Sequence, residues 1–406
     1  MKRILYFHHG GGIGGAPLSL LYLLQRLDRS RYEPVVVTLK PGPVVDLFRS
    51  AGIETHIEPG ISDFSHTTLE WYGGREWWRL PGKLLRIMPS IHRARELVRS
   101  FSPALVHLNS STLAPCAVAC ARERIPVVWH IREPLAQGVF GLRRALLRYV
   151  IDRYADRVIA ISQYDAEQLI PSKRIHVIYN FVDFALFDRS LSGERVRTEL
   201  GIPPDAPVVV MLGGAAEPKG ALILVQAFPA LRAAVPGVQA IIAGPPPCRA
   251  PEPGIKGIAK RLLGAYAYDE ALLSALRQCD RSAQAALHFI GIRQDIPPIL
   301  AAADCLAFPS VVPHFARPII EAAAMGVPAV ASDLGGPREL VLHGETGLLV
   351  PPNDPSALAS ALASILNDPV WGKAMGEMAY QRARSLFDAA ANAAATVAMY
   401  GDVLGI

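Results

Sequence analysis

The chain has 406 residues, of which 51% are hydrophobic and 19% charged, so it is too apolar for a disordered protein and too long for one ordinary core. Its net charge of +5 is unevenly divided: residues 1–189 carry 25 basic against 17 acidic side chains, and residues 190–406 carry 16 against 19. The basic half indicates an anionic partner. No zinc-finger spacing or aromatic RNA-binding motif occurs, so we expect a phosphorylated acceptor or an anionic membrane surface, and no nucleic acid.

Cysteine usage and hydropathy indicate in which cellular compartment the protein is expected. The five cysteines are odd in number and include no C-x-x-C pair, which favours neither a disulfide framework nor a zinc site, so we expect no metal. The apolar run before His8 is too short for a signal peptide, and no stretch of about 18 apolar residues occurs. We expect a cytoplasmic protein that can lie peripherally on the inner face of the cell membrane.

Short β-branched runs alternate with longer amphipathic segments, a pattern typical of βα units and parallel sheets. In the first half the runs lie at 4–7, 35–39, 54–57, 105–107, 127–129, 158–161 and 177–178; in the second half they lie at 208–212, 240–243, 287–290, 305–308, 329–332 and 347–350. A polar stretch at 188–194 separates the two series. We predict an α/β protein with one Rossmann-like domain at 1–188, another at 200–385, and a terminal helical segment at 386–406 that crosses back to the first domain.

Ligands of such folds bind in loops that follow strands. The first of these loops, at 8–17, is rich in glycine and precedes a helix expected to begin at Pro17. It offers backbone N–H groups to a phosphate, but it has neither the lysine of a Walker loop nor a dinucleotide fingerprint. A flexible strand-to-helix turn is the alternative interpretation.

Residues 71–99 combine tryptophans with seven basic and two acidic side chains. Such a mixture favours a membrane–water interface. The alternative is an ordinary helix whose charges form its solvated face. The candidates for acceptor or membrane contact are Trp77, Trp78, Arg79, Lys83 and Arg86.

Two loops of the second half carry candidate charges. Gly213 and Lys219 lie in a glycine-rich loop at the start of a helix, where the lysine is either an ordinary solvated side chain or a ligand of a diphosphate. Pro318 suits the first position of a later helix, which puts Glu321 in its first turn. There the carboxylate would either accept from two ribose hydroxyls or simply complement the helix dipole. A third turn, with Gly335 and Gly336, offers backbone donors.

Taken together, these segments resemble the retaining glycosyltransferases of family four, also called glycosyl transferases group 1. The matching motifs are Pro218-Lys219-Gly220, Gly291-Ile292-Arg293, Pro309-Ser310, Glu321-Ala322, Gly326-Val327-Pro328, Gly335-Gly336 and Gly344-Glu345-Thr346-Gly347, with looser matches at Gly14-Gly15-Ala16 and Val128-Trp129-His130. The resemblance covers nearly the whole chain. It implies the GT-B fold, in which two Rossmann-like domains face each other across a cleft.

The resemblance also implies a role for each matching residue. Lys219 would bind the diphosphate of the donor and Glu321 its ribose. Gly15, Gly213, Gly335 and Gly336 would line the diphosphate and sugar, Arg293 would lie near the base, and His130 would face the transferred sugar and acceptor. The implied co-substrate is a UDP- or GDP-linked sugar, with no other cofactor and no metal.

Two departures from the family pattern bear on the chemistry. Pro313 stands eight residues before Glu321, where a glutamate that contacts the donor sugar is usual, and Gly214 stands where an arginine is usual. We expect His314 or Arg317 to replace the missing acid. The predicted activity is transfer of a sugar, with retention, to a glycan or lipid-linked acceptor in cell-surface polysaccharide or glycolipid synthesis. The alternative is a catalytically silent protein that binds a sugar nucleotide or glycan as a sensor or scaffold.

Overall fold

The computed structural model describes residues 1–62, 79–135, 137–247 and 266–406. The chain forms two compact units: unit 1 comprises Met1–Phe181 with Phe387–Ile406, and unit 2 comprises Val182–Leu386. The first crossing between units therefore follows Phe181, ahead of the boundary placed at residue 188 from the sequence. The final segment belongs to unit 1.

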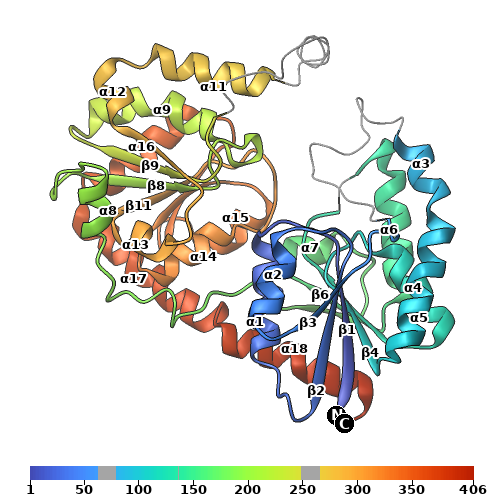
Figure 1. The fold of residues 1–406 in the computed structure, drawn as a ribbon. Coiled ribbons are helices and arrows are strands. Elements are labelled where there is room, and N and C mark those ends of the chain that lie inside the picture. Colours follow the sequence, from blue (N-terminus) through green and yellow to red (C-terminus); the bar gives the residue numbers. More distant parts are fainter. Residues whose placement is uncertain (63–78, 136, 248–265) are drawn as a thin grey trace. The chain divides into compact units, whose positions relative to one another are not determined.

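Unit 1 is built on a seven-stranded sheet in the order β3-β2-β1-β4-β5-β6-β7, and every neighbouring pair is parallel (Figure 1). The strands are β1 (Lys2–His8), β2 (Tyr32–Thr38), β3 (Glu54–Ile57), β4 (Leu105–Leu108), β5 (Val127–Ile131), β6 (Arg157–Ala160) and β7 (Ile175–Val177). The expected doubly wound sheet is confirmed.

Helices cover both faces of this sheet because successive strand residues point to opposite sides. Leu5 and Phe7 pack with α4 (Ile87–Phe101), α5 (Ala114–Glu123) and α6 (Leu142–Tyr154). Ile4 and Tyr6 pack with α1 (Gly15–Gln25), α2 (Pro43–Ser50) and α18 (Ala389–Leu404). The remaining described helices of unit 1 are α3 (Arg79–Leu85), η1 (Val139–Gly141) and α7 (Gln163–Glu167).

Unit 2 repeats the architecture with a six-stranded parallel sheet in the order β10-β9-β8-β11-β12-β13. Its strands are β8 (Val208–Leu212), β9 (Gln239–Ala243), β10 (Leu287–Gly291), β11 (Cys305–Phe308), β12 (Ala329–Ser332) and β13 (Gly347–Val350). Its described helices are α8 (Glu194–Glu199), η2 (Glu217–Lys219), α9 (Ala221–Ala234), α11 (Ala267–Gln278), α12 (Arg281–Ala285), α13 (Ile296–Ala301), α14 (Arg317–Ala324), α15 (Gly335–Leu340), α16 (Pro355–Leu366) and α17 (Pro369–Leu386).

In each unit the parallel strands end at one edge, so the loops that follow them converge there. The cysteines that the structure describes, Cys116, Cys120, Cys279 and Cys305, are buried free thiols. Among the described helices, none combines the length and the apolar character needed to cross a bilayer.

Candidate functional site

The loop after β8 is shaped by two glycines with positive φ. A Cβ on Gly213 would lie 2.8 Å from Cγ of Lys219, so the missing side chain makes room for the lysine. Gly214 has φ +65°, and a Cβ there would lie 2.4 Å from the backbone of Pro245. The arginine expected at position 214 from the family pattern therefore does not fit this backbone.

Lys219, the last residue of η2, is the central cation of unit 2. Its Nζ lies 2.7 Å from Nε2 of His314 and 5.6 Å from the centroid of the Phe308 ring. Burial lowers its pKa to about 8. No carboxylate of the described residues lies within ion-pair distance of Lys219, so its charge is held by a neutral partner and an aromatic face.

His314 lies in the loop between β11 and α14. Its Nδ1 is 3.0 Å from the carbonyl oxygen of Val312, which can only accept, so Nδ1 carries the proton and Nε2 accepts from Lys219. Burial and the neighbouring Lys219 lower the His314 pKa to about 3. The imidazole is therefore neutral at physiological pH.

Arg317 and Glu321 form an ion pair within α14. Nε of Arg317 lies 2.5 Å from Oε1 of Glu321, and both side chains are largely buried. Because α14 begins at Arg317, Glu321 lies in its second turn, and the prediction of a first-turn position was wrong. A dipole role at the helix start is thereby weakened, since the dipole effect falls off within the first turn.

Gly335 and Gly336 open the short helix α15 and do not form a free turn. A Cβ on Gly336 would lie 2.4 Å from the carbonyl oxygen of His314. The second glycine therefore allows α15 to pack directly against the backbone that carries His314. Lys219, His314 and Gly336 thus belong to one cluster at the carboxyl edge of the unit 2 sheet.

Arg293, in the loop after β10, is engaged elsewhere in unit 2. Its guanidinium pairs with Glu199 at 2.5 Å and with Asp295 at 2.7 Å, and hydrogen bonds to these carboxylates raise its pKa. Arg293 therefore forms its hydrogen bonds and ion pairs with these two carboxylates and none with Lys219, His314 or Glu321. Its predicted place near a nucleotide base has no support from these contacts.

In unit 1, the glycine-rich loop after β1 leads into α1, whose first residue is Gly15, two positions ahead of the expected Pro17. A Cβ on Gly11 would lie 2.3 Å from the carbonyl oxygen of Pro41, which explains one glycine by close packing. Gly12 and Gly14 have no atom within 4 Å of an added Cβ, so this part of the loop is open.

His130 does not lie in a loop. β5 continues to Ile131, two residues beyond the predicted end, so His130 belongs to the strand and is 2% exposed. Its ring lies 5.3 Å from that of His107, and neither ring nitrogen has a hydrogen-bond partner. Burial holds its pKa well below the usual range.

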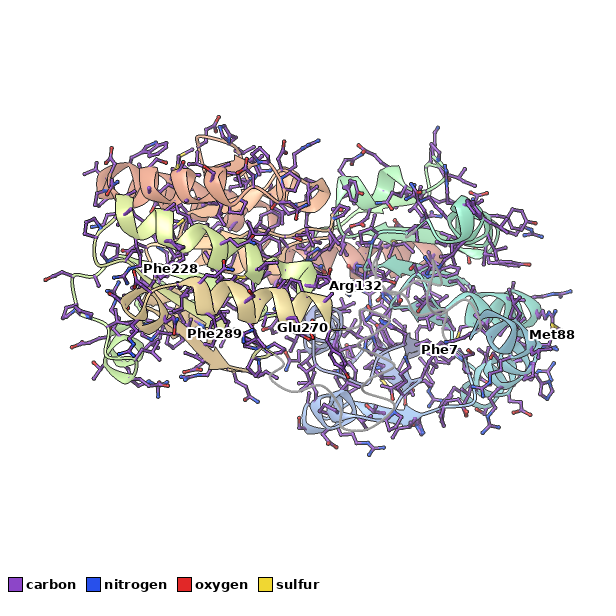
Figure 2. All side chains as sticks on the ribbon, turned by 90° about the horizontal axis from the view of Figure 1, so that it is seen from above. Phe7, Met88, Arg132, Phe228, Glu270 and Phe289 are labelled. Carbon is purple, nitrogen blue, oxygen red and sulfur yellow. The ribbon has the colours of Figure 1, made fainter. Side chains whose placement is uncertain are left out.

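The residue of this segment that does reach the loops is Arg132, labelled in Figure 2, which the sequence analysis missed. Its guanidinium donates to Oδ1 of Asn109 at 2.8 Å and to Oδ1 of Asn180 at 2.7 Å. The Asn109 amide lies 3.1 Å from Nδ1 of His8. These four residues follow or end four parallel strands, and that shared position was the signal in the sequence.

The predicted membrane-contact residues are only partly described. Trp77 and Trp78 lie outside the described residues, and of Arg79 only the backbone, at the start of α3, is described. Lys83 lies in α3 and Arg86 directly follows that helix. Leu84, Leu85 and Met88 are 50%, 79% and 59% exposed, so large apolar side chains reach the surface beside these cations.

Comparison with known proteins identifies relatives of both units. The family described as glycosyl transferases group 1 matches residues 206–368, and glycosyltransferase family 4 matches residues 13–186. A D-inositol 3-phosphate glycosyltransferase of Corynebacterium glutamicum is 32% identical over 59% of this chain. The match spans about half of that relative, 54% of its length. D-inositol 3-phosphate glycosyltransferase 2 of Catenulispora acidiphila is 30% identical over 96% of this chain and 90% of its own.

Solved structures show the same fold. Anabaena HepE in complex with UDP and glucose superposes with a TM-score of 0.77 at 24% identity, covering 99% of this chain and 100% of HepE. A glycosyltransferase from Rickettsia africae superposes with a TM-score of 0.76 at 18% identity, covering 99% of this chain and 98% of its own.

Proposed function

Since the chain belongs to the group 1 and family 4 glycosyltransferases, we propose that it transfers a sugar from a nucleoside-diphosphate sugar to a glycan or lipid-linked acceptor with retention. We place the donor in unit 2 and the acceptor against unit 1. Synthesis of a cell-surface polysaccharide or glycolipid is the role that fits such an acceptor.

The observation that carries this proposal is the ammonium of Lys219, which lies 2.7 Å from a neutral histidine and has no carboxylate at ion-pair distance among the described residues. A buried cation without an anionic partner is costly unless an anion binds it. The diphosphate of a sugar nucleotide would supply that anion. Together with backbone N–H groups, Lys219 would stabilise the departing diphosphate without a metal.

Glu321 and the glycines extend the proposed donor site. The Oε1 atom of Glu321 accepts from Arg317, and the carboxylate as a whole retains further lone pairs for ribose hydroxyls. Gly213 brings backbone close to Lys219 and Gly336 brings it close to His314, while Gly335 begins the same helix as Gly336. HepE was crystallised with UDP-glucose, which supports UDP as the first donor nucleotide to test here, with GDP as the second.

For the acceptor we propose the open part of the loop at Gly12–Gly15 and the loop that carries Arg132. Arg132 is a fixed cation. Burial is the main cause of the lowered pKa of His8 and His130, and the charge of Arg132 adds to it. Both side chains are buried, His130 at 2% and Arg132 at 8% exposed, and Arg132 is the better supported because it follows β5 whereas His130 lies within the strand.

Contact with an anionic membrane surface is part of the proposal, through the exposed residues of α3 and the start of α4. Lys83 and Arg86 stand beside exposed Leu84, Leu85 and Met88. Apolar side chains flanked by cations suit the interface of an anionic bilayer. Equal partitioning of the chain onto neutral and anionic vesicles would contradict the proposed membrane contact.

The activity itself is tested by incubating the purified chain with UDP- and GDP-sugars and measuring release of nucleoside diphosphate. We expect slow release by hydrolysis for one donor, and loss of that release in Lys219→Met. A chain that binds a nucleoside diphosphate but releases none from any donor would be the silent sensor or scaffold. The anomeric configuration of a product, read by NMR, tests retention.

A further inference from the structure

We propose that His314 is a positioning residue that holds the ammonium of Lys219 in place for the diphosphate. This inference rests on the proposed function for its ligand, but the contact itself lies within unit 2 and can be tested without a ligand. The hydrogen bond between Lys219 Nζ and His314 Nε2, at 2.7 Å, is its starting point.

The His314 ring is itself fixed on three sides. Nδ1 lies 3.0 Å from the Val312 carbonyl oxygen and 3.4 Å from Oγ of Ser310, and the ring centroid lies 5.7 Å from that of Phe308. Gly336 packs against the His314 carbonyl group. The acceptor that Lys219 meets is therefore held in one tautomer and one orientation.

The loops that carry the two residues are also joined. Oγ of Ser310 lies 3.0 Å from the carbonyl oxygen of Pro218, and the Val311 amide donates to the same oxygen at 3.3 Å. A Cβ on Gly220 would lie only 1.8 Å from the carbonyl oxygen of Pro309. The backbone on either side of Lys219 thus rests directly on the loop that leads to His314.

Other roles for His314 fit these contacts less well. Both ring nitrogens are occupied, one by Val312 and one by Lys219, so neither is available to a hydroxyl of a donor sugar while Lys219 keeps its place. The ring is neutral, which argues against a general acid. His314 therefore acts through Lys219, and the expectation that it replaces the missing glutamate in contacting the sugar is not favoured by this geometry.

The same contacts explain how the site functions with one cation. The backbone at Gly214 has no room for the second cation of the family pattern, because a Cβ there would meet Pro245. A single flexible lysine loses considerable side-chain entropy when it binds an anion. A fixed acceptor that orients the ammonium beforehand reduces that loss and so raises affinity.

The test is a double-mutant cycle on the full chain, with inorganic pyrophosphate as the probe and calorimetry as the readout. His314→Leu should weaken pyrophosphate binding about ten-fold, the effect of losing one hydrogen bond to a charged group. In the Lys219→Met background the same change should have no further effect. Independent, additive effects of the two substitutions would overturn the proposal.

A second readout needs no ligand. The pH profile of Lys219 acylation, followed by mass spectrometry, gives the pKa of its amine, which should fall in His314→Leu because the charged form loses its acceptor. His314→Gln, whose amide oxygen can accept from Lys219, should restore both the pKa and the affinity in part. An unchanged Lys219 pKa in His314→Leu would refute the positioning role even if pyrophosphate binds.

The matched control is His288→Leu. His288 is a half-buried histidine of the same unit that hydrogen-bonds Gln239, and it should leave both readouts at wild-type values. Melting temperatures of all variants verify folding. A wild-type chain that binds neither pyrophosphate nor any nucleoside diphosphate would overturn the proposed function, while the acylation profile would still decide the role of His314.

Discussion

Binding of a diphosphate in unit 2 is proposed to depend on one titratable amine, that of Lys219. Burial lowers its pKa to about 8, and a bound anion favours the charged form. Affinity for a nucleoside diphosphate should therefore be constant below pH 8 and fall about ten-fold per pH unit above it. Calorimetry from pH 6.5 to 9.5 measures this, and affinity that rises above pH 8 would contradict it.

The titration of Lys219 should change folding stability with pH in the opposite direction to ligand affinity. Between the folded pKa of about 8 and the ordinary value of 10.5, the unfolded chain binds more protons at Lys219 than the folded chain does. The contribution of Lys219 to the free energy of unfolding should thus increase as the pH rises through this window. Comparing urea unfolding of wild type and Lys219→Met at pH 7.5 and 9.5 isolates this contribution.

A substitution at Glu321 distinguishes binding of the nucleoside part of a donor from binding of its diphosphate. Glu321→Gln should weaken UDP or GDP binding about ten-fold, since hydrogen bonds to a charged acceptor are worth about 1.5–3 kcal/mol. Binding of inorganic pyrophosphate, which has no ribose, should stay unchanged. Equal loss for both ligands would show that Glu321 acts through Arg317 and the fold of α14.

At the residue level the sequence indicated which loops carry candidate charges, but it did not predict the side-chain partners that the structure shows. The position of Lys219 before Gly220 left two interpretations open, and only the family resemblance of Pro218-Lys219-Gly220 favoured a diphosphate ligand. The pairing of Lys219 with His314, 95 residues further along the chain, depends on tertiary packing between two loops. The strand predicted at 127–129 ends before His130, whereas β5 continues to Ile131, so His130 belongs to the sheet.

The elements themselves follow the hydrophobic pattern closely. Buried parallel strands appear as short β-branched runs, and β3, β8, β11, β12 and β13 have the predicted bounds. The helix starts were less predictable. Gly14 precedes α1 and Gly335 is the first residue of α15, and neither helix has a side-chain cap. Periodicity gives no signal for such a start.

The backbone of the loop after β8 should not tolerate a side chain at position 214. Restoring the family arginine with Gly214→Arg should lower the free energy of unfolding by at least about 2 kcal/mol, because it combines a positive φ with a backbone clash. It should not increase activity. Gly237→Arg, also at positive φ but with no atom within 4 Å of its Cβ, serves as the control for conformational strain alone.

At the scale of the whole molecule, the last helix, α18, packs against the first strands of the chain within unit 1. In α18, Met399 and Tyr400 are buried with Tyr6 and Tyr32, and the Tyr400 hydroxyl lies 2.8 Å from Nδ1 of His107. Deleting residues 387–406 should therefore unfold unit 1, since each large buried side chain contributes about 1.5–3 kcal/mol. Limited proteolysis should cut unit 1 first, whereas a chain ending at Leu404 should resist cleavage like wild type.

The proposed function requires that unit 2 binds a nucleoside diphosphate through Lys219. The most direct measurement is a thermal shift of the full chain with UDP, GDP and ADP, beside the same series for Lys219→Met. One nucleotide at about 100 times its dissociation constant should stabilise the wild type by about 2.7 kcal/mol and leave Lys219→Met unshifted. No shift of the wild type with any of the three, or equal shifts for both proteins, would contradict nucleotide binding through Lys219.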